Sequence, residues 1–368
     1  MNIVILAAGM GKRMHSRLPK VLQPLAGRPM LDHVLSAVDA LATEKVVVVG
    51  HCAQEVKDHY EGQSGLRFVL QMPQLGTGHA LMQAWPALDK AQSHTLVCLG
   101  DVPLLSSATV EKMKAQAKGD DLVLLTVNLD QPKGYGRIVR NAQGQVTSIV
   151  EEKDATDEQR AIREVNTGIM LLPTARLDGW LKRLSNDNAQ QEYYLTDLIG
   201  FAAQDGVAIS TVQPDHVYEV EGVNSKVQLA TLERVWQRAQ AQRLLEAGVT
   251  LIDPDRIDIR GELVCGRDVE IDVGCIFEGH VELADGVRVG AYSVIRNAKI
   301  EEEVEILPFC HFDGATVGKA SRVGPYSRLR PGAELKGNNH IGNFVEVKKS
   351  VVGLDSKVNH LTYIGDAD

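Results

Sequence analysis

The residues best suited to chemistry near the start of the chain lie in Leu6–Met14, "LAAGMGKRM". An apolar run leads there into Gly9 and Gly11, and two cations follow, the second of them Arg13; Lys20 adds another cation. Glycines let backbone N–H groups approach a phosphate, and cations neutralise its charge. The stretch therefore predicts an anion-binding loop. The alternative is a tight turn whose cations are only solvated.

Two familiar glycine-rich loops do not fit this stretch. A dinucleotide fingerprint needs a third glycine for helix packing, and Met14 stands at that position. A P-loop needs Ser or Thr after its Gly-Lys pair, and Arg13 stands there instead. Both patterns are excluded, and Arg13 is the distinguishing residue.

Asp101 is a second candidate, because it directly follows the apolar run "TLVCLG". If that run is a buried strand, the carboxylate lies at its carboxyl end, where open parallel sheets bind their ligands. A carboxylate there suits a hard divalent cation. The alternative is that Asp101 caps the turn that follows.

The composition limits the class of protein. The 368 residues exceed one ordinary domain, so we expect two. The net charge of -9 argues against nucleic acid or a membrane as partner. The five cysteines form no CxxC pair and lie in apolar contexts, which predicts buried free thiols in a reducing compartment. Since no segment reads as a membrane span or a cleaved leader, we expect a cytoplasmic protein.

The first half of the chain alternates strand and helix patterns. Amphipathic segments at 29–42 and 78–91 lie between continuous apolar runs, which are typical of strands buried on both faces of a parallel sheet. The runs are "NIVILAAG", "KVVVVGH", "LRFVLQ", "TLVCLGD" and "DLVLLTV". This order predicts an α/β domain with an open, doubly wound, Rossmann-like sheet.

A long helix is expected over 224–248, with Gly248 as its C-terminal stop. Its apolar positions follow a helical spacing: Val227, Leu232, Val235, Ala239 and Leu244.

The remainder of the chain repeats every six residues. Large apolar residues recur at Ile259, Cys265, Ile271, Phe277, Leu283, Val289 and Ile295; at Ile300, Ile306 and Phe312; at Val317, Val323, Leu329, Leu335, Ile341 and Val347; and at Val352, Val358 and Ile364. Four residues after most of them stands a smaller one: Val269, Cys275, Val281, Ser293, Thr316, Ser321, Ser327, Ala333, Ser356 and Thr362. Hexads of this kind predict a left-handed parallel β-helix with three strands per triangular coil. The five-residue steps are register corrections or places where a loop starts.

Several motifs together carry a resemblance to a known family. "LAAGMGKRM…LPKVL", "GTGHA", "LGDVPL", "GYGRI", "IVEEKDAT", "NTGI" and "EGVNS" resemble sugar nucleotidyltransferases. With "RLRPGAEL", "IGNFVEVKKS" and "NHLTYIGDA" in the repeats, the whole chain resembles the bacterial family of bifunctional GlmU proteins. The resemblance implies a nucleotidyltransferase domain at 1–223, a linker helix at 224–248 and an acetyltransferase β-helix at 249–368.

The family's first activity transfers uridylyl from UTP to N-acetylglucosamine 1-phosphate, giving UDP-GlcNAc and pyrophosphate. The resemblance implies that Arg13 and Lys20 act in catalysis by neutralising phosphates, and that Asp101 and Asn224 hold Mg²⁺. It further implies nucleotide and sugar contacts from Leu6, Ala7, Ala8, Gly9, Lys20, Gln71, Gly76, Thr77, Leu99, Gly100, Asp101, Gly136, Glu151, Asn166, Thr167 and Asn224.

Plainer roles stay open for some of these residues. Asn224 alone reads as the N-cap of the long helix. Gln71, Asn166 and Thr167 alone read as loop residues whose polar groups are satisfied within the protein.

The family's second activity acetylates glucosamine 1-phosphate with acetyl-CoA. A base must remove a proton from the attacking amine, and His360 in "NHLTY" is the candidate because its pKa lies near the working pH. Arg330, Lys348 and Tyr363 match the family's positions for the sugar phosphate. The other repeat histidines, His280, His311 and His340, read as surface residues.

The chain stops within a repeat, at "YIGDAD", and the sequence leaves open why it ends at Asp368. The family continues for several coils and a C-terminal arm, which complete its acetyl-CoA pocket. We therefore expect intact uridylyl transfer and absent or impaired acetyl transfer in these 368 residues. We also expect a homotrimer, because β-helices of this type associate through their flat faces.

Two alternatives are weighed against this interpretation. One is a monofunctional nucleotidyltransferase that makes ADP-glucose or dTDP-glucose and carries a regulatory β-helix; His360 beside Lys348 and Arg330 argues against it. The other is a non-catalytic assembly subunit, which would be free to lose Arg13, Lys20 or Asp101. UDP-GlcNAc made in the cytoplasm would feed peptidoglycan and, in Gram-negative cells, lipopolysaccharide synthesis.

Overall fold

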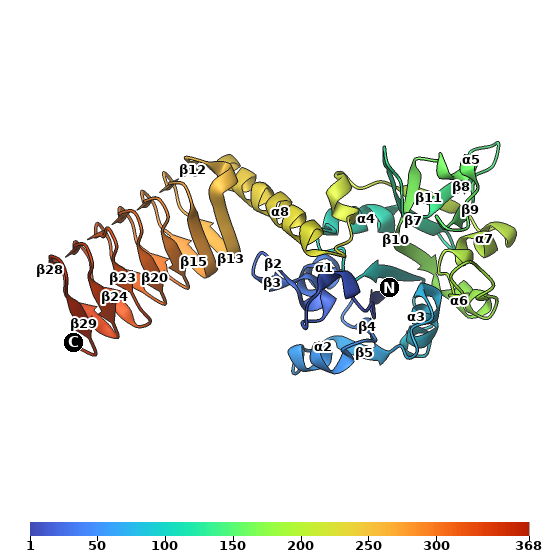
Figure 1. Cartoon of the computed structure of the whole chain (residues 1–368), viewed down its shortest axis with the longest axis horizontal. Coiled ribbons are helices and arrows are strands. Elements are labelled where there is room, and N and C mark those ends of the chain that lie inside the picture. Colours follow the sequence, from blue (N-terminus) through green and yellow to red (C-terminus); the bar gives the residue numbers. More distant parts are fainter. Residues whose placement is uncertain (368) are drawn as a thin grey trace. The chain divides into compact units, whose positions relative to one another are not determined.

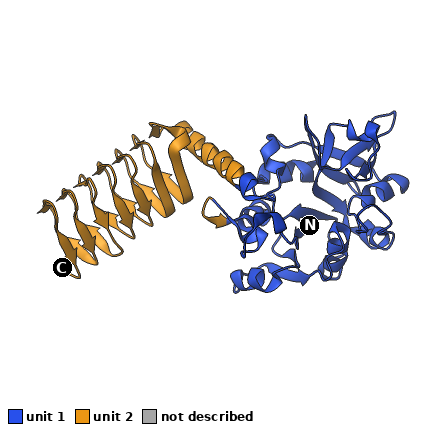
Figure 2. Cartoon of the chain, viewed as in Figure 1, with its two compact units in different colours: residues 1–25, 29–229 blue, residues 26–28, 230–368 orange. Residues whose placement is uncertain are grey.

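The computed structural model describes residues 1–367 and divides into two compact units (Figure 2). Unit 1 comprises residues 1–25 and 29–229, and unit 2 comprises residues 26–28 and 230–368. The division falls in the first turn of α8 (Lys226–Glu246). The expected boundaries lie close by, at 223/224 and 248/249, and the functional labels of those domains stay a prediction. Asp368 lies outside the described residues.

Unit 1 is an α/β unit, coloured blue to yellow-green in Figure 1. Its strands are β1 (Asn2–Ala7), β2 (Pro24–Leu25), β3 (Arg28–Pro29, of which Arg28 belongs to unit 2), β4 (Lys45–Val49), β5 (Leu66–Leu70), β6 (His94–Leu99), β7 (Leu122–Asn128), β8 (Arg137–Arg140), β9 (Val146–Val150), β10 (Glu164–Pro173) and β11 (Ile209–Val212). Its α-helices are α1 (Met30–Val38), α2 (Ala53–His59), α3 (Thr77–Ala84), α4 (Ser107–Gln116), α5 (Asp157–Arg160), α6 (Thr174–Leu181) and α7 (Asp197–Gln204). Its 3-10 helices are η1 (Lys12–Met14), η2 (Lys20–Leu22), η3 (Asp39–Leu41), η4 (Trp85–Ala87) and η5 (Val217–Val220).

The sheet of unit 1 confirms the doubly wound expectation. Its strand order is β11-β7-β10-β6-β1-β4-β5, and β1 lies parallel to both β4 and β6. Strand order reverses on either side of β1, and ligands of such sheets bind beyond the carboxyl ends of the strands at that point. The interior strands β1, β4, β6 and β7 are buried almost throughout, as continuous apolar runs require.

Two details of the sheet differ from expectation. β10 lies antiparallel between β6 and β7, because the chain enters it from the β8–β9 hairpin. An apolar run carries no signal of strand direction, so the sequence did not reveal this. β5 is half-exposed and not buried on both faces, because it is the edge strand and has a neighbour on one side only.

Unit 2 contains the repeats, orange to red in Figure 1. Besides most of α8 and the 3-10 helix η6 (Pro254–Arg256), its strands are β12 (Thr250–Leu251), β13 (Ile257–Cys265), β14 (Glu270–Ile271), β15 (Cys275–Leu283), β16 (Arg288–Val289), β17 (Val294–Arg296), β18 (Lys299–Ile300), β19 (Glu305–Ile306), β20 (His311–Asp313), β21 (Thr316–Val317), β22 (Arg322–Val323), β23 (Arg328–Leu329), β24 (Ala333–Leu335), β25 (His340–Ile341), β26 (Glu346–Lys348), β27 (Ser350–Val352), β28 (Lys357–Val358) and β29 (Tyr363–Gly365).

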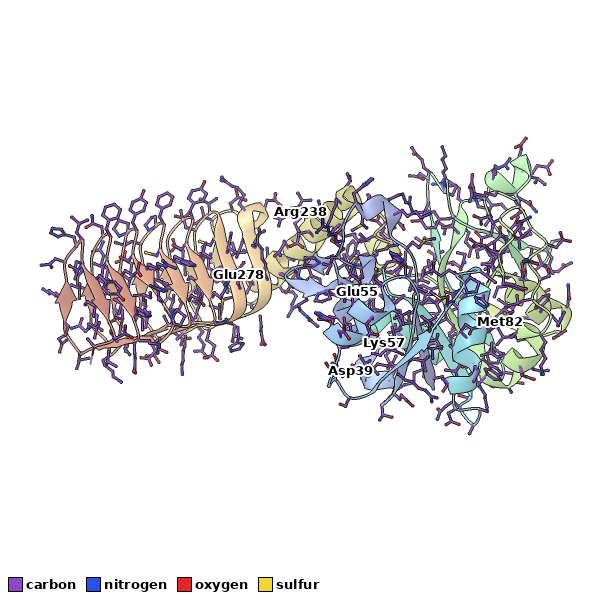
Figure 3. The ribbon with its side chains drawn as sticks, turned by 60° about the horizontal axis from the view of Figure 1, so that its bottom comes forward. Asp39, Glu55, Lys57, Met82, Arg238 and Glu278 are labelled. Atoms are coloured by element: carbon purple, nitrogen blue, oxygen red, sulfur yellow. The ribbon has the colours of Figure 1, made fainter. Side chains whose placement is uncertain are left out.

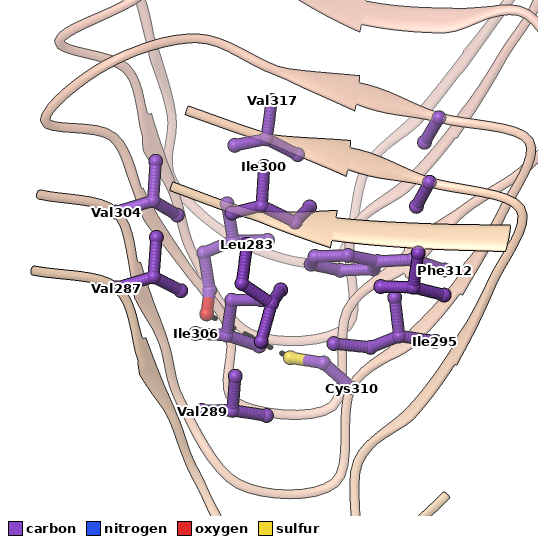
Figure 4. Close-up of a cluster of buried hydrophobic side chains, with 14 of the residues drawn as sticks. Leu283, Val287, Val289, Ile295, Ile300, Val304, Ile306, Cys310, Phe312 and Val317 are labelled. Carbon is purple, nitrogen blue, oxygen red and sulfur yellow. Dashed lines mark hydrogen bonds between the residues drawn. The ribbon is translucent and has the colours of Figure 1, made fainter. Parts of the chain in front are cut away.

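The repeats form the parallel β-helix that the hexads predict. Equivalent residues of successive coils pair in parallel, 17 or 18 residues apart, as in the series Ile259, Phe277, Ile295, Phe312. The large residue of nearly every hexad is buried in one continuous core, part of which Figure 4 shows. Inside it the Cys310 thiol donates to the Val323 carbonyl oxygen at 3.7 Å. Each coil thus buries its apolar face against its neighbours.

The five-residue steps have a structural explanation. They run from Ile295 to Ile300, from Phe312 to Val317 and from Val347 to Val352, and in the coils they stack at one corner. The turn residue there has a positive φ each time, at Asn297, Gly314 and Lys349. These steps are therefore tight turns and not loop insertions.

Two residues that were predicted to face a hydrophobic core, Thr316 and Val227, do not do so. Thr316 is not the small core residue of its hexad, because the shortened step moves that role to the buried Ala315. Val227 is 77% exposed, since α8 begins only at Lys226 and its first turn faces solvent. Gly248 does end α8, with a φ of 94°.

A row of exposed aromatic rings follows one corner of the β-helix. Tyr292, Phe309, Tyr326 and Phe344 stack in successive coils, with ring centroids 5.5, 4.9 and 5.4 Å apart. Each is about half exposed and has a positive φ. We call these four residues the aromatic ladder.

The cysteines are free thiols, and Cys98, Cys275 and Cys310 are buried. Burial raises the pKa of Cys98 to about 12, so this thiol stays protonated. Within residues 1–367, no helix is both long and apolar enough to cross a membrane.

Candidate active site

The Lys20 ammonium lies between two polar side chains at the end of the sheet in unit 1. Its Nζ donates to Asn224 Oδ1 at 2.7 Å and forms a short ion pair with Asp101 Oδ2. The Lys20 side chain is 9% exposed and that of Asp101 is 23% exposed, so the pair is partly shielded from water. Asn224 is therefore not the N-cap of α8; Ser225 Oγ instead accepts from the Gln228 N–H at 3.3 Å.

Backbone contacts hold these residues at the carboxyl ends of β1 and β6. The Gly100 N–H donates to Leu6 O, and the Val223 N–H donates to Asp101 O, both at 2.9 Å. Gly11 has a φ of 60°, and a Cβ there would lie 2.8 Å from the Lys20 Cβ. A glycine is needed at this position so that the loop and Lys20 can approach each other.

A buried carboxylate anchors the segment that carries Asn224. Glu219 is 3% exposed and accepts from Ser106 Oγ at 2.5 Å, Thr109 Oγ1 at 2.7 Å and the His216 N–H at 3.0 Å. Three donors compensate its desolvation. Glu219 thus fixes η5 and the turn that leads from it to Asn224.

The site opens into a cavity of about 410 Å³. Many of the residues implied by the family resemblance line it: Arg13, Thr77, Leu99, Asp101, Gly136, Glu151, Asn166, Thr167 and Asn224. Others lie outside the lining: Leu6, Ala7, Ala8, Gly9, Lys20, Gln71, Gly76 and Gly100. Lys20 contacts the lining residues Asp101 and Asn224, whereas Gln71 and Gly76 form a separate hydrogen-bonded pair.

The loop after β1 is held by its backbone. Ala8 O accepts a short hydrogen bond from the Gln74 carboxamide, while Gly9 is exposed. Arg13 is exposed beside the cavity and has no hydrogen-bond or ion-pair partner in the described part of the chain. Its guanidinium is therefore available to an anion.

Glu151 is, besides Asp101, the acidic residue of the cavity lining. Its Oε1 accepts from Thr196 Oγ1 at 3.0 Å, and the absent side chain of Gly136 leaves space beside it. Burial raises the pKa of Glu151, and the neighbouring carboxylates of Asp154 and Asp197 act in the same direction, while the Thr196 hydrogen bond opposes them. Its carboxylate can accept hydrogen bonds from a ligand that enters the cavity.

Asn166 and Thr167 combine cavity lining with internal hydrogen bonds. Thr167 Oγ1 donates to Leu125 O at 2.8 Å, so its hydrogen is already used. Asn166 Oδ1 accepts from the Gly168 N–H at 3.1 Å, while its Nδ2 has no partner among residues 1–367. The plain structural role thus describes Thr167 well, and Asn166 keeps a free donor.

The predicted site residues do not include several residues of the cavity lining, among them the polar side chains of Lys133, Tyr135, Thr196 and Gln228. Lys133 is an exposed cation beside "GYG", and a cation next to a glycine pair was the available signal. Nothing in the sequence pairs Thr196 with Glu151, which lies 45 positions earlier.

Asp101 and Asn224 fit a hard divalent cation. Both direct an oxygen at one positive charge, the Lys20 ammonium, and carboxylate and amide oxygens are ligands that Mg²⁺ accepts. The described residues contain no cluster of three or more His, Cys, Asp or Glu side chains suited to a metal. Any cation here would therefore depend on ligand phosphates and water for its remaining coordination.

Three of the four residues expected at the second site, Arg330, Lys348 and Tyr363, lie on consecutive coils of unit 2. Arg330 and Lys348 are equivalent positions of consecutive coils, since the residues before them, Leu329 and Val347, pair in register. Arg330 Nη1 donates to Glu346 Oε1 at 2.8 Å, and Glu346 pairs in register with Tyr363.

His360 is exposed, and its ring has no partner up to Ala367. His280, His311 and His340 are also exposed, as expected of surface residues.

Comparisons with known proteins identify relatives along the whole chain. A family model described as MobA-like NTP transferase domain matches residues 3–167. Proteins named bifunctional protein GlmU are 57% identical over 369 residues in Aromatoleum aromaticum and 60% identical over 368 residues in Ralstonia nicotianae. These matches cover 100% of this chain and 81% and 80% of the relatives. A solved nucleotidyl transferase from Methanothermobacter is 22% identical, with a TM-score of 0.46, over 65% of this chain and 98% of its own, too distant to bear on the site.

Replacing Glu151 with glutamine should stabilise unit 1 at neutral pH. The folded state ionises this carboxyl at a higher pKa than the unfolded chain does, so stability falls as the pH rises between the two values and stays lower above them. Glu151→Gln removes that cost, and its carbonyl oxygen can still accept from Thr196. We expect a gain of about 1.4 kcal/mol in the free energy of unfolding for each unit by which the pKa is raised.

Urea unfolding at neutral pH measures this gain. The gain should vanish below about pH 4, where an ordinary carboxyl group is protonated. Glu44→Gln, at an exposed glutamate, is the matched control and should change little. A Glu151→Gln protein that is less stable than wild type at neutral pH would contradict the expectation.

Proposed function

The chain belongs to the family of bifunctional GlmU proteins, and we propose on that basis that unit 1 transfers uridylyl from UTP to N-acetylglucosamine 1-phosphate. The products are UDP-GlcNAc, a precursor of cell-wall polymers, and pyrophosphate. One observation carries the proposal: a cation and two oxygen ligands, Lys20, Asp101 and Asn224, meet at the end of β6, beside a cavity lined by Arg13.

The reaction brings two polyanions together, so charge neutralisation and positioning should supply most of the rate. Arg13, Lys20 and the exposed Lys133 are the cations that would hold the phosphates, with Arg13 nearest the leaving pyrophosphate. Asp101 and Asn224 would hold Mg²⁺, which draws charge from the phosphate oxygens when bound.

The sugar end of the cavity suits N-acetylglucosamine. The Glu151 carboxylate would accept from sugar hydroxyls, and the free Asn166 Nδ2 would donate to a sugar oxygen or to the acetamide carbonyl. Gly136 leaves the space that the ring requires. Gln71, Gly76 and Thr77 would contact the uracil, and backbone groups of Leu6, Ala7, Ala8, Gly9, Leu99 and Gly100 would lie along the nucleotide.

The family's second activity, acetylation of glucosamine 1-phosphate with acetyl-CoA, belongs to unit 2. Arg330 and Lys348, one coil apart, would hold the sugar phosphate with Tyr363, and His360 would take the proton from the attacking amine. The chain spans about four fifths of the length of these relatives. Release of the CoA thiol is the direct measurement of acetyl transfer.

We propose a cytoplasmic homotrimer. Free cysteines fit a reducing compartment, where UTP and acetyl-CoA are made. The exposed aromatic ladder is an apolar strip that a neighbouring subunit could cover. Sedimentation equilibrium of the full chain measures the subunit number, and a monomer would contradict the proposal.

Removing the charge of Asp101 should abolish most uridylyl transfer. We expect Asp101→Asn to lower the rate of UDP-GlcNAc formation from UTP, N-acetylglucosamine 1-phosphate and Mg²⁺ by at least about a hundredfold, because a charged ligand at the reacting phosphates is lost. Asp187→Asn, at an exposed aspartate, should leave the rate unchanged. Faster turnover of glucose 1-phosphate by the wild type would overturn the substrate assignment.

Removing the Lys20 ammonium should strengthen metal binding in the absence of nucleotide. The ammonium lies between Asp101 and Asn224, so a metal ion must displace it, whereas UTP phosphates would draw it away. We expect Lys20→Met to bind Mn²⁺ roughly tenfold more tightly than wild type, measured as free Mn²⁺ by electron paramagnetic resonance. Uridylyl transfer should fall.

Lys12→Met is the matched control for this measurement, because Lys12 is exposed. It should leave Mn²⁺ affinity as in the wild type. Equal Mn²⁺ affinity of Lys20→Met and wild type would show that the ammonium does not compete with the metal.

A further inference from the structure

His79, in the first turn of α3, contacts the side chain of Gln71. The Gln71 Nε2 donates to Gly76 O at 2.8 Å and lies 3.2 Å from His79 Nδ1. On the other side of the ring, His79 Nε2 lies 3.1 Å from Gln83 Nε2, one helical turn further on. Met82, labelled in Figure 3, marks the same helix.

The positions of the hydrogens at these contacts follow from which atoms can donate and which can accept. Gly76 O can only accept, so the Gln71 carboxamide must turn its nitrogen toward it. The second hydrogen of the same nitrogen then points to His79 Nδ1, which must be unprotonated to accept it. The ring proton is then left on Nε2. The Gln83 carboxamide, whose nitrogen lies 3.1 Å from this atom, must therefore be turned so that its oxygen accepts from it.

The surroundings favour this neutral ring. Burial lowers the pKa of His79, and the ring lies 6.2 Å from that of Tyr193, centroid to centroid. A protonated ring would direct a hydrogen from Nδ1 against the hydrogens of Gln71 Nε2. The neutral form therefore preserves the whole chain of hydrogen bonds.

The free end of Gln71 is its oxygen. Gln71 is 3% exposed, yet Oε1 has no hydrogen-bond partner among residues 1–367. An atom without a partner is either fully buried or accessible to solvent. Among residues 1–367, Ser210 Oγ is the one side-chain polar atom that is fully buried without a partner, so Gln71 Oε1 is accessible to solvent. Gly76, which holds Gln71, directly precedes Thr77 of the cavity lining.

We propose that His79 is a positioning residue that makes Gln71 a hydrogen-bond acceptor toward the nucleotide base, and thereby selects uracil over cytosine. This inference rests on the proposed uridylyl transfer, in which Gln71 contacts the base. Uracil carries an N–H at its N3 position, which can donate to the Gln71 oxygen. Cytosine has a lone pair there, so the two acceptors repel each other.

The test compares UTP with CTP in variants of the full chain. Replacing His79 with leucine removes the acceptor for the second Gln71 hydrogen, so only the Gly76 carbonyl oxygen still favours this orientation of the carboxamide, and the reversed orientation becomes more populated. We expect the UTP-to-CTP ratio of kcat/KM to fall about tenfold, the equivalent of one hydrogen bond. His79→Asn keeps an acceptor and should restore part of the ratio. His94→Leu, at a buried histidine outside these contacts, is the control and should lower stability without changing the ratio.

A double-mutant cycle separates this role from general damage to the fold. In a Gln71→Leu background, His79→Leu should not lower the ratio further, since the carboxamide is already absent. The inference is overturned if His79→Leu keeps the wild-type ratio, or if it lowers the ratio equally in both backgrounds.

Calorimetric binding of UTP and CTP to the same variants gives a second ratio that needs no turnover. This measurement reports on His79 even if the wild type forms no UDP-GlcNAc. The absence of UDP-GlcNAc would instead count against the proposed function.

Discussion

The ion pair between Lys20 and Asp101, shared with the Asn224 carboxamide, is the interaction on which the site depends. Its members lie 81 and 204 positions from Lys20 in the sequence, and each reaches the site on a different segment. Such partly shielded charges are costly when unpaired, so folding must bring all three segments together. Three residues make this approach possible. Gly11 leaves space for Lys20, the Gly100 N–H donates to the Leu6 carbonyl oxygen, and Glu219 anchors the turn that leads to Asn224.

The sequence predicts the fold better than the details of the site. Alternation of apolar runs and a strict hexad period each follow from which side chains must be buried, so the sheet and the β-helix were both foreseeable. Strand direction in β10 was not, because burial does not depend on it. The predicted burial of Thr316 was wrong for a related reason. A shortened turn changes which residue faces the core, while the apolar pattern of the sequence hardly changes.

The predicted site residues also fall into two groups, according to whether the structure places them in the cavity lining. Charged residues with an obvious task, such as Arg13, Asp101 and Glu151, lie at one cavity in the structure. Residues that were predicted to contact the nucleotide through their backbone, such as Ala8, are not among the cavity-lining residues. The partners of functional groups were hardest to foresee. Thr196 beside Glu151 and His79 beside Gln71 depend on packing between distant or differently oriented segments, which no local pattern encodes.

The corner where the five-residue steps stack has a consequence for how such a chain can evolve. Each coil touches only its neighbours, so a duplication or deletion of one whole coil leaves every other contact intact. The insertion or deletion of a single residue within a strand would turn its buried side chains outward. At Asn297, Gly314 and Lys349 the turn has already absorbed the loss of one residue. That corner is therefore where the gene for this protein can gain or lose single codons without damage to the core.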